Sequence, residues 1–204
     1  MSAHLSALFG WVTCAILIAA FGVRLFPSTV RPEPVEGPFQ APRRRALLAL
    51  ALFLIALVPL GNHPGLAAGL HGLFGPPSIT LFQLALLTVL GRPWPDLPNR
   101  RLSILWVLGF GVFYALSLGA FRTLLPDPYA WGFHPQWLCA PLLLLGWVLY
   151  RRGQNGWLML LTINLVIWAS GLPASQNLWD SLFDPLLVVI IGIRGWRTQG
   201  SRSP

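Results

Sequence analysis

The chain has 204 residues, of which 55% are hydrophobic and only 10% are charged. A soluble domain carries about 25% charged residues, so this composition excludes a water-exposed globule and favours a protein that crosses a membrane several times. All 14 basic residues are Arg, and they exceed the six acidic residues to give a formal net charge of +8. The two Cys are too few for a disulfide scaffold.

Seven apolar runs follow one another along the sequence, at about 5–23, 46–61, 76–91, 103–121, 136–150, 157–172 and 174–193. A membrane-spanning helix needs about 20 mostly apolar residues. The runs therefore predict an all-α, polytopic transmembrane helical bundle with six core spans plus one N-terminal span. Several runs are short for a full span, so we expect flanking residues to extend them.

The Arg residues alternate between the segments that separate these runs. Thirteen of the 14 fall in every second segment, and Arg122 is the exception. By the positive-inside rule, the basic segments are predicted to be cytoplasmic, with the N-terminus outside and the C-terminus inside a bacterial inner membrane. We interpret the positive charge as a signal of topology and of contact with the lipid bilayer, and we expect no nucleic-acid partner.

The first 45 residues differ from the rest of the chain. Residues 26–45 read FPSTVRPEPVEGPFQAPRRR, which is too rich in Pro and charge to build a packed element. The stretch STVRPEPVEGP resembles the translation of a dispersed bacterial repeat element. Two interpretations stay open: residues 1–45 are an appendage or a wrongly chosen start, or they are an ordinary first helix with a flexible linker. Residues 46–197 are the predicted membrane core, and residues 198–204 a cytoplasmic tail.

The predicted topology places the four His residues, Asp127 and Asp180 on the outer side of the membrane, so the outer side is where a site is expected if the chain has one. His63 and His71 lie in the Gly-rich and Pro-rich segment 61–78, and His134 lies further along the chain. Eight residues of continuous helix rise about 12 Å, too far for His63 and His71 to bind one metal ion. We expect these two side chains to donate hydrogen bonds at the interface, and we expect no metal and no cofactor.

The C-terminal element begins with a helix-capping pattern. Asn177 is predicted to cap a helix whose first turn contains Asp180. Asp184 is predicted one turn deeper on the same face, inside the apolar layer and beside Pro185. Two roles for it stay open: it bonds freed backbone groups or pairs with Arg122 or a His, or it handles protons or a ligand. Asn164 is expected to hydrogen-bond to a neighbouring helix.

Two short motifs stand out, D-P-Y-x-W-G-F at 127–133 and N-L-W-D-S-L-F-D-P at 177–185. Asp127 between two prolines predicts a turn. With these motifs, residues 46–193 resemble a small uncharacterised family of bacterial polytopic inner-membrane proteins. The resemblance implies the architecture and no assigned activity.

Three functions are compatible with these patterns. The sequence favours a non-enzymatic membrane component or assembly factor of the cell envelope, with membrane proteins as possible partners. The second is a small permease or proton-coupled carrier that uses Asp184 and Asn164. The third is an intramembrane enzyme with an outer-face His/Asp site, and the absence of P-loop, G-x-S-x-G, H-E-x-x-H and C-x-x-C motifs counts against it.

Overall fold

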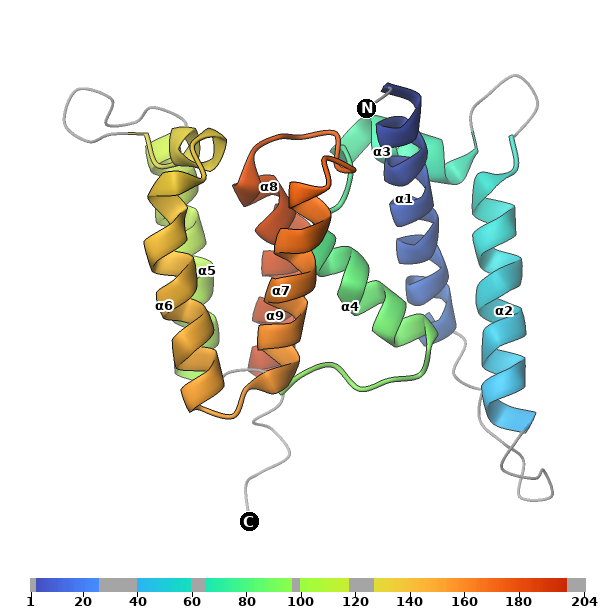
Figure 1. Cartoon of the computed structure of the whole chain (residues 1–204). Coiled ribbons are helices and arrows are strands. Elements are labelled where there is room, and N and C mark those ends of the chain that lie inside the picture. Colours follow the sequence, from blue (N-terminus) through green and yellow to red (C-terminus); the bar gives the residue numbers. More distant parts are fainter. Residues whose placement is uncertain (1–2, 26–39, 60–64, 97–99, 118–126, 198–204) are drawn as a thin grey trace, which may run out of the picture. The chain divides into compact units, whose positions relative to one another are not determined.

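The computed structural model describes residues 3–25, 40–59, 65–96, 100–117 and 127–197. Within these ranges the chain is all-α and has no strand, which confirms the all-α part of the predicted fold class, and each of the seven apolar runs overlaps a helix. In chain order the elements are α1 (Ala3–Leu25), α2 (Gln40–Leu57), α3 (Leu66–Phe74), α4 (Ile79–Val89), α5 (Arg100–Ser117), the 3-10 helix η2 (Tyr129–Phe133), α6 (Gln136–Arg151), α7 (Asn155–Ala169), α8 (Leu178–Leu182) and α9 (Pro185–Arg197) (Figure 1).

The bounds of several helices follow from capping residues. Ser78 begins α4, because its side-chain oxygen accepts a hydrogen bond from the backbone N–H of Leu81 at 3.1 Å. Gly91 follows the end of α4 with a φ of +70°, a left-handed conformation that glycine adopts without steric cost. The Gly-rich and Pro-rich segment 61–78 contains the nine-residue helix α3.

One helix in the described ranges, His4–Leu25 of α1, is both long and apolar enough to cross a membrane. The core helix of a soluble protein and an N-terminal signal sequence meet the same criteria. Other helices are apolar but shorter: α4 rises only about 17 Å, whereas the hydrocarbon core of a bilayer is about 30 Å thick. The helix lengths alone therefore leave the six core spans plus one N-terminal span as a prediction.

The chain divides into two compact units. Unit 1 contains Met1–Trp94 with Gly171–Ala174, and unit 2 contains Pro95–Ser170 with Ser175–Pro204. The boundary after Trp94 differs from the expected one after residue 45, because α1 packs against α2, α3 and α4 inside unit 1. Whether residues 1–45 originated as an appendage stays a prediction.

Unit 1 is built on the close approach of small residues. Cys14 and Ala15 of α1 are buried with Ala56 of α2 and Ala67 of α3. A Cβ atom added to Gly22 of α1 would lie 2.5 Å from a methyl carbon of Leu52 on α2. Such small side chains let helix backbones approach closely, as is common where helices pack within a membrane.

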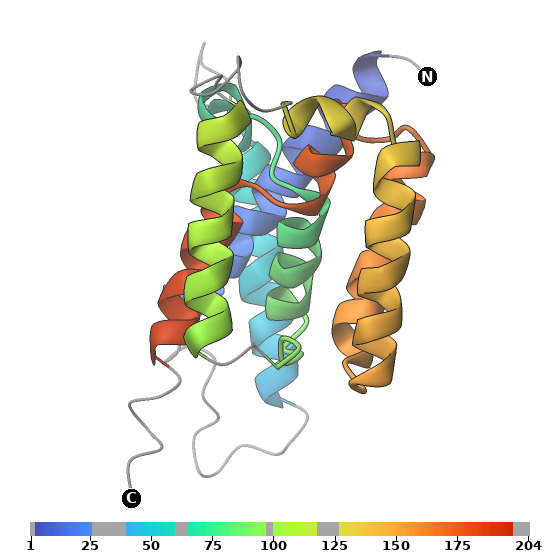
Figure 2. The same ribbon diagram turned by 90° about the vertical axis from the view of Figure 1, so that its left-hand side faces the viewer.

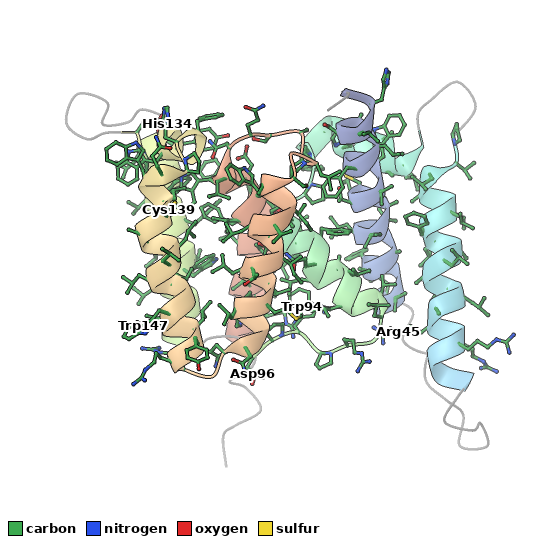
Figure 3. The ribbon with its side chains drawn as sticks, in the orientation of Figure 1. Arg45, Trp94, Asp96, His134, Cys139 and Trp147 are labelled. Atoms are coloured by element: carbon green, nitrogen blue, oxygen red, sulfur yellow. The ribbon has the colours of Figure 1, made fainter. Side chains whose placement is uncertain are left out.

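In unit 2, α5 packs against α9 and α6 packs against α7, while η2 contacts α5, α6 and α8 (Figure 2). The helix η2, the end of α7 and the short helix α8 lie at one end of the unit. The turn between α6 and α7 lies at the opposite end. Figure 3 shows His134 at the first end of unit 2 and Asp96 with Trp147 at the second.

Candidate functional site

The two sequence motifs contact each other at the first end of unit 2, and we call this contact the Tyr129–Asp180 junction (residues 127–133 and 175–184). The side-chain Nδ2 of Asn177 donates a hydrogen bond to the backbone oxygen of Tyr129 at 3.1 Å. The indole Nε1 of Trp179 donates to the backbone oxygen of Pro128 at 2.9 Å. Each bond joins residues about fifty positions apart, so together they fasten η2 to the start of α8.

Asn177 has two roles at this junction. Its side-chain oxygen accepts a hydrogen bond from the backbone N–H of Trp179 at 2.9 Å, so it caps α8 as the sequence pattern predicted. Its side-chain nitrogen makes the bond to η2 described above. Asn177 is 0% exposed, so both bonds are shielded from solvent in the folded chain.

Gly132 is required for this close approach. A Cβ atom at residue 132 would lie 1.7 Å from the side-chain oxygen of Asn177 and 2.8 Å from Cδ1 of Trp179. Both distances are far below a van der Waals contact. The junction therefore depends on a glycine in η2 as much as on the polar side chains of the second motif.

The carboxylate of Asp180 accepts hydrogen bonds from both sides of the junction. The hydroxyl of Tyr129 lies 3.1 Å from Oδ1 and 2.9 Å from Oδ2 of Asp180. The hydroxyl of Ser175 donates to Oδ2 at 2.6 Å. Hydrogen bonds to a charged acceptor are stronger than those between neutral groups, so this carboxylate adds a charge-assisted link to the backbone links.

Tyr129 is a proton donor at this site. Burial, followed by the hydrogen bond to Asp180 and the negative charge of that carboxylate, raises the pKa of Tyr129 from 10.0 to about 12. The phenol therefore stays protonated near neutral pH and does not act as a base. The geometry therefore fits a Tyr129 hydroxyl that holds the Asp180 carboxylate by a hydrogen bond better than one that transfers its proton.

We expect Tyr129→Phe to lower the free energy of unfolding by about 1–2 kcal/mol, because it removes a hydrogen bond to a charged group and keeps the ring. The pKa of Tyr129 is higher in the folded state, so its contribution is complete below pH 10 and is lost as the pH rises through about 12. The wild-type chain should lose more stability than Tyr129→Phe over this range.

Unfolding measured at several pH values in detergent tests this expectation. The matched control is Tyr150→Phe, because the Tyr150 side chain is exposed on α6. If Tyr129→Phe and Tyr150→Phe had the same free energy of unfolding and the same dependence on pH above 10, the hydrogen bond from Tyr129 to Asp180 would be contradicted.

Aromatic side chains from α5 pack beneath the junction. The ring centroids of Phe113 and Trp179 lie 5.2 Å apart, and those of Phe110 and Phe183 lie 5.3 Å apart, both in edge-to-face geometry. Such pairs stabilise by about 0.5–1.5 kcal/mol beyond their buried area. The motif residues thus connect η2, α5 and α8.

The prediction that one helix carries both Asp180 and Asp184 is wrong, whereas the structure agrees with the alternative in which Asp184 bonds a backbone group. The sequence suggested one helix that carries Asp180 and Asp184 on the same face, but α8 ends at Leu182 and Phe183 is extended, with φ −154° and ψ 155°. Oδ1 of Asp184 accepts a hydrogen bond from the backbone N–H of Leu187 at 2.8 Å, in the first turn of α9. Pro185 is favourable as the first residue of a new helix, so the chain restarts there instead of kinking.

Asn164 is confirmed as a residue that bonds to a neighbouring helix. Its side chain is 0% exposed on α7, and Nδ2 donates to the backbone oxygen of Ser181 on α8 at 2.7 Å. Asp127 confirms the predicted turn, because Oδ1 accepts a hydrogen bond from the backbone N–H of Tyr129 at 2.9 Å. Both residues act on backbone groups of the junction or of α8.

The two predicted His residues that the structure describes, His71 and His134, belong to different units. His134 is exposed directly after η2, whereas His71 lies on α3 in unit 1 with its ring against Gly10. His63 and Arg122 lie outside the described residues, so the proposed pairing of Arg122 with Asp184 stays a prediction. Among the residues that the structure describes, no three His, Cys, Asp or Glu side chains are grouped as a metal site requires.

No protein-family model matches the chain, and neither a curated protein nor a solved structure matches it significantly. The resemblance carried by the motifs at 127–133 and 177–185 therefore stays a prediction.

The sequence indicated both motifs but not the contact between them, nor the roles of Gly132, Ser175 and Trp179. One signal was available: Asn177, Trp179 and Asp180 occur together at the start of one helix. These are more polar groups than a helix cap requires, which indicates a further partner.

Proposed function

We propose that the chain is a multi-pass protein of a bacterial inner membrane that acts as a non-enzymatic component or assembly factor of the cell envelope. The observation that carries this proposal is the apolar surface of α6. Leu143, Leu144 and Trp147 share one face of this helix and are 74%, 60% and 59% exposed. Side chains of this size need an apolar covering, which a lipid bilayer or a membrane-protein partner provides.

The charges of unit 2 support a membrane orientation. The start of α5, the end of α6 and the end of α9 lie at the same end of unit 2 (Figure 1). Arg100 is the first residue of α5, Arg151 is the last residue of α6, and Arg194 lies in the last turn of α9. The opposite end contains the Tyr129–Asp180 junction with its acidic groups. This separation agrees with the positive-inside rule, with the Arg-containing end in the cytoplasm.

The polar groups of the junction support a structural role over a catalytic one. The carboxylate of Asp180 accepts bonds from Tyr129 and Ser175, and Asn177 is bonded through both ends of its amide. Asp184 caps α9, so its carboxylate already holds a backbone group, and this geometry does not favour the carrier alternative.

Labelling of single cysteines with a membrane-impermeant maleimide tests the predicted topology. In a chain with Cys14→Ala and Cys139→Ala, we expect Gln176→Cys to react in intact spheroplasts. We expect Asn155→Cys to react only after permeabilisation. Both residues are exposed and flank α7 at opposite ends, so each is the control for the other. Equal labelling of both in intact spheroplasts would contradict a span at α7.

The proposed role in an envelope complex is tested separately, by purification of the full chain and by deletion of its gene. A defined membrane-protein partner that remains bound to the full chain in several detergents would agree with the proposal. A monomer in every detergent, with no phenotype on deletion of the gene, would contradict it.

A further inference from the structure

An apolar groove lies in unit 1 between α1, α2 and α4. Its volume is about 590 Å³, within the range of small-molecule sites. Ala19 on α1 and Ala49 on α2 are small enough to leave this space open, and Phe53 and Leu86 contribute to its walls. Among the described residues that line the groove, Arg45 is the one that carries a charge.

Two guanidinium groups meet at the end of α4 beside this groove. The Arg45 side chain donates a hydrogen bond to the backbone oxygen of Thr88, and Arg24 donates to the Thr88 hydroxyl at 3.5 Å. The Arg24 guanidinium also lies 4.8 Å from the ring centroid of Trp94. Nε of Arg45 is buried and has no hydrogen-bond partner in the structure. Like charges this close repel each other, so an anion between them is favourable.

The described part of unit 1 supplies no such anion. Residues 3–25, 40–59, 65–94 and 171–174 contain no Asp and no Glu. Within the described residues, the groove therefore combines an apolar interior with a cationic end that has no acidic partner. A small hydrated anion satisfies only the cationic end, whereas an anionic amphiphile satisfies both.

We propose that this groove binds an anionic phospholipid, with one acyl chain between α1, α2 and α4 and the phosphate at Arg45 and Arg24. Arg is suited to this contact, because its planar donors match phosphate oxygens. Trp94 is an aromatic residue of the kind that lies at the headgroup level, and the topology predicts the cytoplasmic side, where basic pockets between helices bind anionic headgroups. The proposal rests on the contacts within unit 1 and on the proposed membrane location of the chain.

Lipid binding to the full chain tests the proposal. The delipidated protein in detergent is titrated with dioleoyl-phosphatidylglycerol or dioleoyl-phosphatidylcholine, which have the same tails, and bound lipid is counted by native mass spectrometry. We expect phosphatidylglycerol to be retained about tenfold more strongly, since a charged contact to the headgroup is worth about one decade of affinity. Glycerol 1-phosphate, a headgroup without tails, is the competitor and should not displace the lipid at equal concentration.

Two matched pairs of variants separate the headgroup contact from the tail contact. Arg45→Gln should weaken phosphatidylglycerol binding about tenfold, whereas Arg43→Gln, on the same helix but exposed, should change it less than about twofold. Ala46→Phe fills the groove and should reduce retention with both Arg residues intact. Leu47→Phe is its control, because Leu47 is exposed and does not line the groove.

Equal retention of the two lipids would overturn the proposal, as would equal effects of the two Arg variants. Displacement by glycerol 1-phosphate would assign the site to a small anion and would also overturn it. Arg45 also bonds to α4, so Arg45→Gln removes a contact inside unit 1. If thermal unfolding shows that this variant is not folded, the comparison of Ala46→Phe with Leu47→Phe tests the proposal in its place. Equal retention by that pair would overturn the proposal.

Discussion

Gly132→Ala is expected to lower the free energy of unfolding by about 2–4 kcal/mol, because overpacking a tight contact forces the backbone or its partners to move. The added Cβ would lie 1.7 Å from the side-chain oxygen of Asn177, which is fixed by the hydrogen bond that caps α8. Either the cap or the docking of η2 must be lost. Thermal unfolding of the full chain in mild detergent, followed by circular dichroism, measures the effect.

Gly109→Ala is the matched control for this substitution. Gly109 lies within α5, and apart from its chain neighbours and the backbone of its own helix no atom lies within 4 Å of the Cβ that alanine would add. Replacement of a helix-interior Gly by Ala stabilises by up to about 1 kcal/mol, so the two variants should shift in opposite directions. A Gly132→Ala chain as stable as Gly109→Ala would show that η2 does not dock on α8 as described.

Asn177→Ala is expected to have an effect of the same size, a loss of about 2–4 kcal/mol in the free energy of unfolding. Removal of the cap costs about 1 kcal/mol, and the backbone oxygen of Tyr129 left without its donor costs about 1–3 kcal/mol more. Asn177→Ser keeps a capping oxygen but cannot reach η2, so it should fall between the wild type and Asn177→Ala. The same unfolding experiment measures both variants.

The control for the second prediction is Asn155→Ala, at an exposed position at the start of α7, where we expect a change within about 0.5 kcal/mol. The double variant Gly132→Ala with Asn177→Ala should cost less than the sum of the single variants, because the clash with the amide no longer exists. Additive costs, or an Asn177→Ala chain as stable as Asn155→Ala, would argue against a shared junction.

The local features of this fold were predictable from the sequence, since they depend on neighbouring residues. The apolar runs predicted the helices, and the spacing of Asn177 and Asp180 predicted the start of α8. Asp184 was misplaced because the extended conformation of Phe183 divides one apparent helix into two. From the sequence alone, a Pro that kinks one helix cannot be distinguished from a Pro that begins the next helix, and Pro185 is of the second kind.

The long-range contacts were not predictable in the same way. Neither the bond from Asn177 to Tyr129 nor the bond from Arg45 to Thr88 has a signature in a single sequence, because the paired residues are 48 and 43 positions apart. The groove of unit 1 was missed for the same reason. Its walls come from three helices that are separated along the chain.

The Tyr129–Asp180 junction also imposes an order on the assembly of unit 2. Its two halves lie on either side of the α6–α7 pair, so the chain must be synthesised beyond residue 180 before η2 acquires its partners. Until then the carbonyl groups of Pro128 and Tyr129 lack the donors that they have in the finished protein. The contact between η2 and the start of α8 thus joins the two ends of the α6–α7 hairpin. It forms only after both helices of the hairpin have been synthesised.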